Sequence, residues 1–328
     1  MAAPLHWDLF CRVVDNYGDI GFGWRLAADL AGRGDRVRLW VDDASALAWM
    51  APGGASGVQV LPFDTAGQPT AATAAEVVVE LFGCDPPRSF VTAMAARARP
   101  PLWINLEHLS AETWVERAHG LPSPHASGLT KWFWFPGFTP NTGGLLREPG
   151  LALPATQPVA DRAASVFCYP NPALPALARD WHGPLKLCPG PAQADPALRG
   201  ERLPWLTQPG YDALLRGCAV NFVRGEDSIV RAIWAGRPFV WQIYPQHDGV
   251  HRIKLDAFLA RLLEGTGDEF ARALTTLWHA WNGFAGWPAP AHWPDMAAWS
   301  QACLRWRDRL LAQTDLVGQL RRFVLERR

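Results

Sequence analysis

Short runs rich in Val, Leu and Ile alternate with helical patterns in the first half of the chain, and this alternation restricts the fold most. The runs that predict strands are residues 9–14, 36–41, 58–63, 77–82 and 102–106. Between the first two, residues 21–31 carry apolar side chains at helical spacing. Apolar strands that are separated by helices are typical of a parallel sheet covered on both faces.

The alternation restarts after a proline-punctuated, uncharged stretch at residues 151–160, which is typical of an interdomain connection. The later predicted strands are residues 165–169, 185–187, 203–206, 219–223 and 239–243. Helical patterns follow at residues 250–263, 269–281 and 297–324. We therefore expect an N-terminal Rossmann-like domain at 1–155 and a C-terminal one at 156–328, with the last helix packing back on the N-terminal domain.

Two doubly wound α/β domains that face each other across a cleft are typical of the GT-B architecture, and we predict this fold by analogy. In such sheets, ligands bind beyond the carboxyl ends of the strands. Dehydrogenases share the alternation, but Gly18, Gly21 and Gly23 form GxxGxG instead of the dinucleotide-binding GxGxxG. A Walker-type phosphate loop is also absent from the sequence.

The charge balance and the cysteines narrow the functional class. The 328 residues carry a net charge of zero, and this gives no support to nucleic-acid binding. The six cysteines form no CxxC pair, so free thiols in the cytoplasm are expected and a structural zinc site is not. The sequence contains no apolar run of membrane-spanning length and no signal peptide, so we expect no membrane partner.

Residues 220–228, VNFVRGEDS, predict a strand, a tight turn and a helix start. The first turn of a helix presents backbone N–H groups and the positive end of the helix dipole to an anion. The amides of Asp227 and Ser228, with Arg224 beside them, would suit a diphosphate. The alternative is structural: Asp227 or Ser228 caps the helix, and Arg224 pairs with a carboxylate.

Asp15 and Asp19 lie four residues apart, across a glycine-containing turn that follows the first predicted strand. One interpretation is a carboxylate pair in which one member acts as a base and the other orients it. The alternative is an Asx-turn at Asp15 and a helix N-cap at Asp19. Two carboxylates together with three glycines at one strand end favour the functional interpretation.

Several long motifs resemble one family, the protein-arginine rhamnosyltransferases that modify bacterial elongation factor P. These motifs are FCRVVDNYGDIG at 10–21, WFWFPGF at 132–138, GGLLRE at 143–148, RGEDS at 224–228 and AGRPFVWQIYPQ at 235–246. They fall in both predicted domains, and the resemblance covers most of the chain.

The resemblance implies an inverting GT-B-like glycosyltransferase. Such an enzyme would move L-rhamnose from dTDP-β-L-rhamnose to an arginine of elongation factor P, and so activate that factor for ribosomes stalled at polyproline. It also implies an acceptor-binding N-terminal domain, a donor-binding C-terminal domain, no metal and no further cofactor. The absence of a DxD motif agrees with a metal-independent reaction.

The resemblance also assigns site residues. Asp19 matches the general base, Asp15 a second essential aspartate and Glu226 an essential glutamate. The residues that match the donor side are Phe167, Tyr169, Trp205, Gln208, Arg224, Asp227 and Ser228. Trp205 stands where the family has Phe, so stacking on thymine is retained in a wider pocket. Asn16, Tyr17, Gly18 and Gly21 are weaker candidates for either side.

Two other functions remain open at this point. One is another GT-B nucleotide-sugar transferase or an epimerase, with a different donor or acceptor. The other is a protein-binding module that responds to a nucleotide sugar without catalysis. Asn105 and Glu107 are candidates for acceptor docking or for loop caps, and we interpret His247 and His251 as surface or packing residues.

Overall fold

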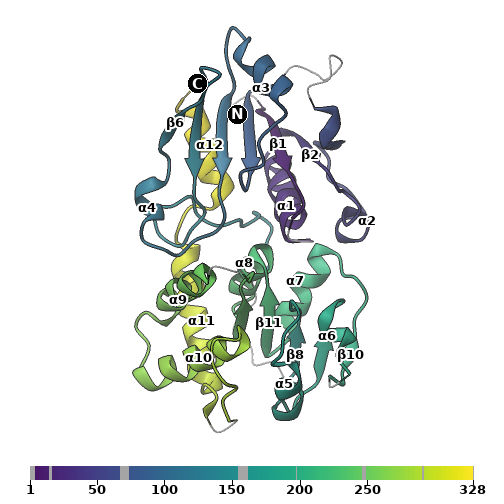
Figure 1. The fold of residues 1–328 in the computed structure, drawn as a ribbon, viewed down its shortest axis with the longest axis vertical. Helices are drawn as coiled ribbons and strands as arrows, with labels where there is room; N and C mark the ends of the chain where they lie inside the picture. Colours follow the sequence, from purple (N-terminus) through teal and green to yellow (C-terminus); the bar gives the residue numbers. More distant parts are fainter. Residues whose placement is uncertain are drawn as a thin grey trace. The chain divides into compact units, whose positions relative to one another are not determined.

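Two units, each built around its own sheet, make up the chain. The computed structural model describes residues 4–14, 17–66, 74–153, 162–196, 198–245, 249–289 and 292–327. One unit combines Met1–Leu151 with Gln313–Arg328, and the other is Ala152–Ala312 (Figure 1). We refer to them as unit 1 and unit 2.

Unit 1 alternates strands and helices up to its fifth strand and then adds a hairpin-like edge. Its strands are β1 His6–Cys11, β2 Arg36–Val41, β3 Val58–Pro62, β4 Val77–Leu81, β5 Leu102–Leu106, β6 Pro122–Pro124 and β7 Thr130–Trp134. Its helices are α1 Gly18–Gly32, α2 Leu47–Met50, η1 Phe63–Thr65, α3 Arg88–Ala95, α4 Val115–Ala118 and α12 Leu316–Leu325.

The unit 1 sheet has the order β3-β2-β1-β4-β5-β7-β6, and only the edge pair β6 and β7 is antiparallel. Strand order reverses direction between β1 and β4, and doubly wound sheets bind ligands at such a switch point. Helices α1 and α12 cover one face through a shared apolar core that includes Leu26 and Leu320. Helix α3 and η1 cover the other face, where Phe10 packs against Phe63 and Phe90.

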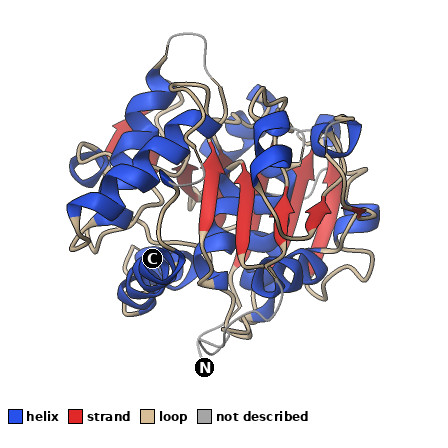
Figure 2. Cartoon of the chain, turned by 90° about the horizontal axis from the view of Figure 1, so that it is seen from below, coloured by secondary structure: helices blue, strands red, loops and turns tan. Residues whose placement is uncertain are grey.

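Unit 2 repeats this plan with shorter strands. Its strands are β8 Ala164–Val166, β9 Leu185–Leu187, β10 Glu201–Arg202, β11 Val220–Arg224 and β12 Phe239–Gln242. Its helices are α5 Leu174–Asp180, α6 Pro191–Ala194, α7 Gln208–Gly217, α8 Glu226–Ala235, α9 Val250–Leu263, α10 Asp268–Trp281 and α11 Met296–Leu311. The order β10-β9-β8-β11-β12 is parallel throughout and puts its switch point between β8 and β11. Figure 2 shows helices on both sides of the strands.

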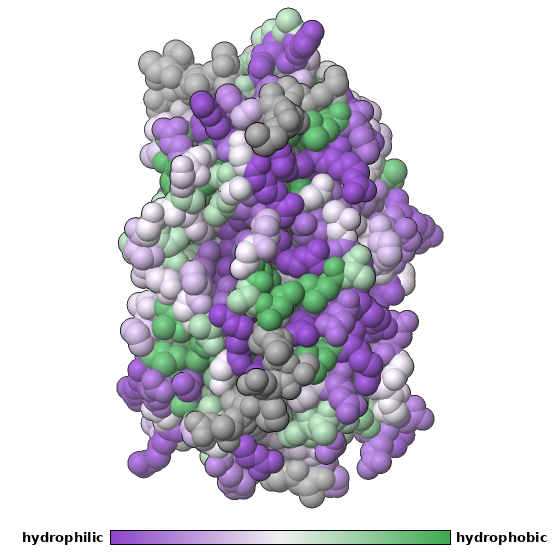
Figure 3. Space-filling model, turned by 180° about the vertical axis from the view of Figure 1, so that it is seen from behind, coloured by the Kyte–Doolittle hydropathy of each residue, from purple (hydrophilic) through white to green (hydrophobic). Residues whose placement is uncertain are grey.

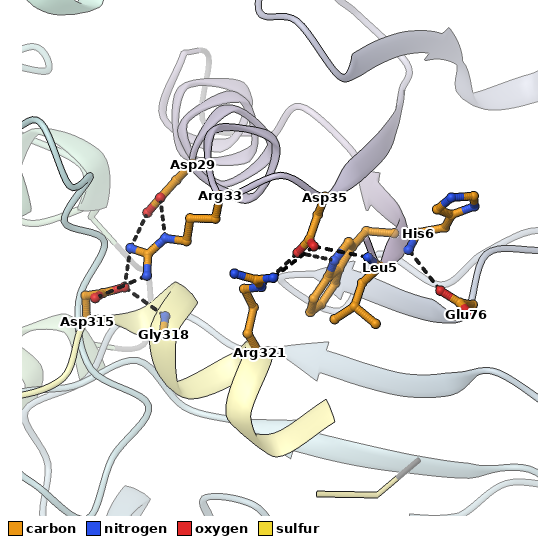
Figure 4. Close-up of polar contacts among 10 residues, drawn as sticks. Leu5, His6, Asp29, Arg33, Asp35, Glu76, Asp315, Gly318 and Arg321 are labelled. Carbon is orange, nitrogen blue, oxygen red and sulfur yellow. Dashed lines mark hydrogen bonds and ion pairs between the residues drawn. The ribbon is translucent and has the colours of Figure 1, made fainter. Parts of the chain in front are cut away.

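A seam of ion pairs holds α12 on unit 1, although about 160 residues separate it from the rest of that unit in sequence. Arg33 at the end of α1 donates to Asp29 at 2.7 Å and to Asp315, the N-cap of α12, at 2.7 Å. Arg321 pairs with Asp35 at 3.0 Å, and Asp35 also accepts a hydrogen bond from the backbone N–H of Leu5 (Figure 4). The seam therefore ties the last helix to both α1 and the start of β1.

The fold agrees with the predicted α/β class and differs from the expectation in several places. Strand β1 is His6–Cys11 and not residues 9–14, and helices α3 and α4 were not predicted. The single helical pattern at 297–324 is two helices, because Asp315 caps a new helix by accepting from the N–H of Gly318. Strands β6 and β7 were not predicted. Pro122 and Pro124 make the β6 segment look like a loop in the sequence, because proline is tolerated in a sheet only at an edge. The strand expected at 203–206 is the shorter β10, which ends at Arg202.

The surface is mostly hydrophilic on the face drawn in Figure 3, and the cysteines are unpaired, as their spacing predicted. Hydrophobic residues gather on this face in small patches. Every helix in the described part of the chain is too short or too polar to cross a membrane. All six cysteines are buried free thiols.

We expect Leu320→Ala to lower the free energy of unfolding by about 3 kcal/mol, because this fully buried side chain fills the core between α12 and the sheet. The measurement is urea denaturation followed by tryptophan fluorescence. Leu325→Ala makes the same chemical change in the same helix at a side chain that is 48% exposed, and it should cost less than about 1 kcal/mol. Equal losses in the two variants would contradict the packing of Leu320 between α12 and the sheet.

Candidate active site

Asp19 lies in the first turn of α1, just beyond the carboxyl end of β1. The helix begins at Gly18 after Tyr17, so Asp19 is not the N-cap that the structural alternative required. Its Oδ2 accepts a hydrogen bond from the N–H of Val14 at 2.8 Å, and the residue is 8% exposed. This contact ties the carboxylate to the β1–α1 loop at the switch point of the unit 1 sheet.

The neighbours of Asp19 pack the start of α1. Tyr17 contacts Trp49 edge to face at 5.4 Å, and the N–H of Gly21 donates to the carbonyl of Tyr17 at 3.0 Å. Gly18 opens the helix. Asp15 and Asn16 lie outside the described residues, so their predicted roles stay predictions.

Asn105 and Glu107 lie where β5 ends. The Asn105 amide donates to Glu107 at 2.8 Å and accepts from the N–H of Gly83 at 3.3 Å. These contacts fit the loop-cap interpretation of both residues. His251 packs against Phe284 with ring centroids 5.0 Å apart, while His247 is outside the described residues.

Glu80, a fully buried carboxylate near the carboxyl end of β4, was not predicted as a site residue. Lys131 lies 2.9 Å from Glu80 and 2.9 Å from Asp85, and its ammonium group sits 4.4 Å from the ring centroid of Trp103. Burial raises the pKa of Glu80 to about 7, and Lys131 opposes only part of this rise. The sequence could not predict that Glu80, Asp85 and Lys131 lie together, because Lys131 belongs to β7, a strand that was not predicted.

In unit 2, three predicted donor-side residues meet at the switch point. Arg224 ends β11, and its Cζ lies 4.5 Å from the ring centroid of Phe167 and 4.5 Å from that of Tyr169. The two rings follow β8, the neighbour of β11 in the sheet. Arg224 is 9% exposed. The aromatic faces therefore hold the guanidinium in one orientation at the end of the strand.

The turn after Arg224 leads directly into α8. Gly225 has φ 71°, a backbone conformation that favours glycine, and the helix begins at Glu226 without a side-chain cap. Asp227 and Ser228 lie in the first turn and do not cap the helix. First-turn N–H groups have no carbonyl within the helix to bond, so this turn can bind an anion beside Arg224.

The two candidates for base recognition lie at the start of α7. Gln208 is the first residue of α7 and is 8% exposed, after the N-cap Thr207, whose Oγ1 accepts from the N–H of Gly210. Trp205 precedes the cap and is 41% exposed. An exposed indole next to a helix start can stack on an aromatic base.

Two side chains that support Phe167 and Tyr169 were not predicted, because neither lies in a motif that indicates a role. Gln242, at the end of β12, accepts from the N–H of Tyr169 at 2.9 Å and so fixes the loop after β8. Tyr211 on α7 packs edge to face on Phe167 at 5.8 Å. Burial raises the pKa of the Tyr211 phenol, and burial raises the pKa of the Cys168 thiol to about 12, so both groups are neutral at pH 7.

No group of three His, Cys, Asp or Glu side chains within the described ranges is arranged to hold a metal ion. Asp19 belongs to unit 1, and the donor-side cluster of Arg224, Phe167 and Tyr169 belongs to unit 2. In each unit these residues lie beyond the carboxyl ends of parallel strands, at the switch point of the sheet. This is where doubly wound sheets bind ligands.

Solved structures show which class of protein has this architecture. The spinosyn rhamnosyltransferase SpnG, complexed with thymidine diphosphate, matches with a TM-score of 0.56 at 13% identity, over 98% of this chain and all of that one. The glycosyltransferase VinC matches with a TM-score of 0.55 at 13% identity, over 99% of this chain and all of that one. At this identity the likeness concerns the fold alone, and the fold is that of GT-B glycosyltransferases.

Closer comparisons show the family. The model of the elongation factor P (EF-P) rhamnosyltransferase EarP matches residues 7–188 and 182–325. Protein-arginine rhamnosyltransferases of Pseudomonas aeruginosa and Pseudomonas putida are 40% and 43% identical, over 97% of this chain and 98% of each relative. A structure of EarP-mediated arginine glycosylation of translation elongation factor EF-P matches with a TM-score of 0.62 at 29% identity, over 98% of this chain and 99% of that one. The chain belongs to the EF-P rhamnosyltransferase family.

Glu80→Gln should change how stability depends on pH. Because the folded pKa of about 7 lies above the reference value of 4.5, the folded protein holds the extra proton between these values. The wild type should therefore lose up to about 3 kcal/mol as the pH rises from about 4.5 through 7. Glu80→Gln should lack this loss in urea denaturation at pH 5, 6, 7 and 8. The exposed Glu269→Gln is the control, and a wild-type-like profile for Glu80→Gln would contradict the assignment.

Proposed function

We propose that the chain transfers L-rhamnose from dTDP-β-L-rhamnose to an arginine side chain of elongation factor P, with inversion at the anomeric carbon. The observation that carries this proposal is the clamp of Arg224 between Phe167 and Tyr169, beside the start of α8, in a chain of this family. A fixed guanidinium next to first-turn amides suits the diphosphate of a nucleotide sugar. The spinosyn rhamnosyltransferase SpnG, a structural neighbour with the same fold, is complexed with thymidine diphosphate, and this supports a thymidine nucleotide as donor.

On the donor side, each predicted residue has a physical task. Arg224 would pair with the diphosphate, and the first turn at Asp227 and Ser228 would stabilise the charge that develops as dTDP leaves. Trp205 would stack on thymine, and Gln208 would bond to its edge. Phe167 and Tyr169 would hold Arg224 in place, as their 4.5 Å contacts support.

On the acceptor side, the difficulty is the protonated guanidinium, which is a poor nucleophile. A carboxylate can bind this cation, orient one nitrogen and accept a proton as the C–N bond forms. We assign this role to Asp19, whose orientation is supported by the N–H of Val14. By family resemblance, Asp15 and Glu226 would assist, with Asn16, Tyr17, Gly18 and Gly21 shaping the loop. Direct attack on the β-linked sugar gives an α-linked product in one displacement.

The reaction as proposed needs no metal, because Arg224 and the α8 start supply the positive charge that a metal would otherwise supply. No further cofactor is proposed beyond the donor substrate. We place the reaction in the cytoplasm, since six free cysteines suit a reducing compartment. Modification of elongation factor P would then activate it for ribosomes stalled at polyproline.

The test of the activity is the intact mass of elongation factor P after incubation with the protein and dTDP-β-L-rhamnose. We expect a gain of one deoxyhexose on one arginine. Asp19→Asn should lower the rate by about 100-fold or more, because it removes the base while its side-chain oxygen can still accept from Val14.

Asp64→Asn makes the same chemical change at an exposed position and should retain the wild-type rate. Absence of any mass gain, with dTDP still bound by calorimetry, would reject elongation factor P as the acceptor. Full activity of Asp19→Asn would reject Asp19 as the base.

A second test concerns the base of the donor. Trp205→Ala should weaken dTDP binding by about tenfold, because one stacked base contributes about 1–3 kcal/mol. Trp205→Phe, which installs the residue that the family has here, should stay within about threefold of wild type. Trp114→Ala removes an indole of similar exposure, 46%, from unit 1 and should leave the affinity unchanged. Isothermal titration calorimetry checks all three, and an unaffected Trp205→Ala would remove Trp205 from the site.

A further inference from the structure

A buried ion pair joins the two helices whose first turns carry donor-side residues. Arg231 on α8 donates from Nε to Oδ1 of Asp212 at 2.9 Å and from Nη2 to Oδ2 at 2.6 Å. Asp212 lies on α7, and the side chains are 2% and 11% exposed. The two parallel hydrogen bonds fix the relative orientation of the guanidinium and the carboxylate.

The positions of the pair along the helices connect it to the site. Asp212 follows Gln208 by four residues, and Arg231 follows Ser228 by three. Residues three or four apart lie on the same face of a helix, about one turn from each other. The ion pair therefore links α7 and α8 one turn below Gln208 and one turn below Ser228.

The other end of α7 is held separately. The amide of Asn221 on β11 donates to the carbonyl of Leu215 at 2.9 Å, and its Oδ1 accepts from the hydroxyl of Ser165 on β8 at 2.6 Å. These contacts attach the last turn of α7 to the sheet. The ion pair lies closer to the first turns of α7 and α8, as does Tyr211, which packs on Phe167.

Stability alone is a weak reason for such a pair. Removing two charges from water costs free energy that their attraction often does not recover, and apolar residues of similar volume can do as well. A planar Arg fork on a carboxylate does supply fixed geometry, which a Lys at the same place does not. The pair is thus better suited to setting a distance than to adding stability.

We propose that Asp212 and Arg231 are positioning residues that set the spacing between the base-binding start of α7 and the diphosphate-binding start of α8. The two ends of one nucleotide diphosphate must be held at once, so a change in this spacing weakens both contacts together. The identity of the ligand rests on the proposed function. Neither residue touches the donor in this proposal.

The test compares Arg231→Lys and Asp212→Asn with the wild type. The first readout is the Kd for dTDP by calorimetry, which should rise about tenfold, equivalent to about 1.4 kcal/mol of binding free energy. The Michaelis constant for dTDP-β-L-rhamnose should rise with it, while that for elongation factor P stays unchanged. The second readout needs no ligand: hydrogen exchange of the peptides covering α7 and α8 should become faster.

The matched control is Arg38→Lys in unit 1. Arg38 forms a similar fork on the fully buried Asp8, at 2.6 and 2.7 Å, and belongs to a different unit from the donor-side residues. It should alter neither the Kd for dTDP nor exchange in α7 and α8. Far-UV circular dichroism confirms folding, and the conservative Arg231→Lys carries the test if Asp212→Asn fails to fold.

Different results would reject the proposed donor and the positioning role of Asp212 and Arg231. If the wild type does not bind dTDP, the proposed donor is wrong, and hydrogen exchange alone then decides the positioning role. Unchanged exchange in α7 and α8 overturns that role, with or without dTDP binding. Wild-type affinity in Arg231→Lys, or an equal loss of affinity in Arg38→Lys, also overturns it.

Discussion

Parallel pairing of β8 with β11 is the constraint on which the donor-side cluster depends. Parallel neighbours end at the same edge of the sheet, so the rings that follow β8 meet the arginine that ends β11. In unit 1 the pairing of β1 with β4 sets the switch point of the sheet, and the β1–α1 loop at that point is held to Asp19 through the N–H of Val14. Strand order thus decides where chemistry can occur in each unit.

Buried polar contacts then hold irregular backbone in place around these edges. Gln242 fixes the backbone of Tyr169, the indole of Trp241 donates to the carbonyl of Gly225, and Val14 fixes Asp19. Each contact satisfies a group that would be costly to bury alone, and each orients a neighbour of the site. The Asp212–Arg231 pair belongs to the same class of support, at the scale of whole helices.

Much of the fold was predictable, and two of the missed features share one cause. Strands at Arg36–Val41, Leu102–Leu106 and Leu185–Leu187 coincide with their predictions, because apolar runs with clear turns reveal their own bounds. The pair β6 and β7 and the break at Asp315 were missed. An edge strand and a capped helix start depend on partners distant in sequence: β6 is ordered by β7, and Asp315 is held by Arg33.

By itself, the sequence determined the α/β class, the family and the local geometry of the strand–turn–helix at Arg224 to Ser228, because periodicity, glycine and motif are local properties. Only the tertiary structure decided that Phe167 and Tyr169 enclose Arg224, that Lys131 lies against Glu80, and that Arg231 reaches Asp212. Those contacts join segments between 19 and 57 residues apart. Long-range pairing of this kind follows from strand order and helix packing, which no local pattern encodes.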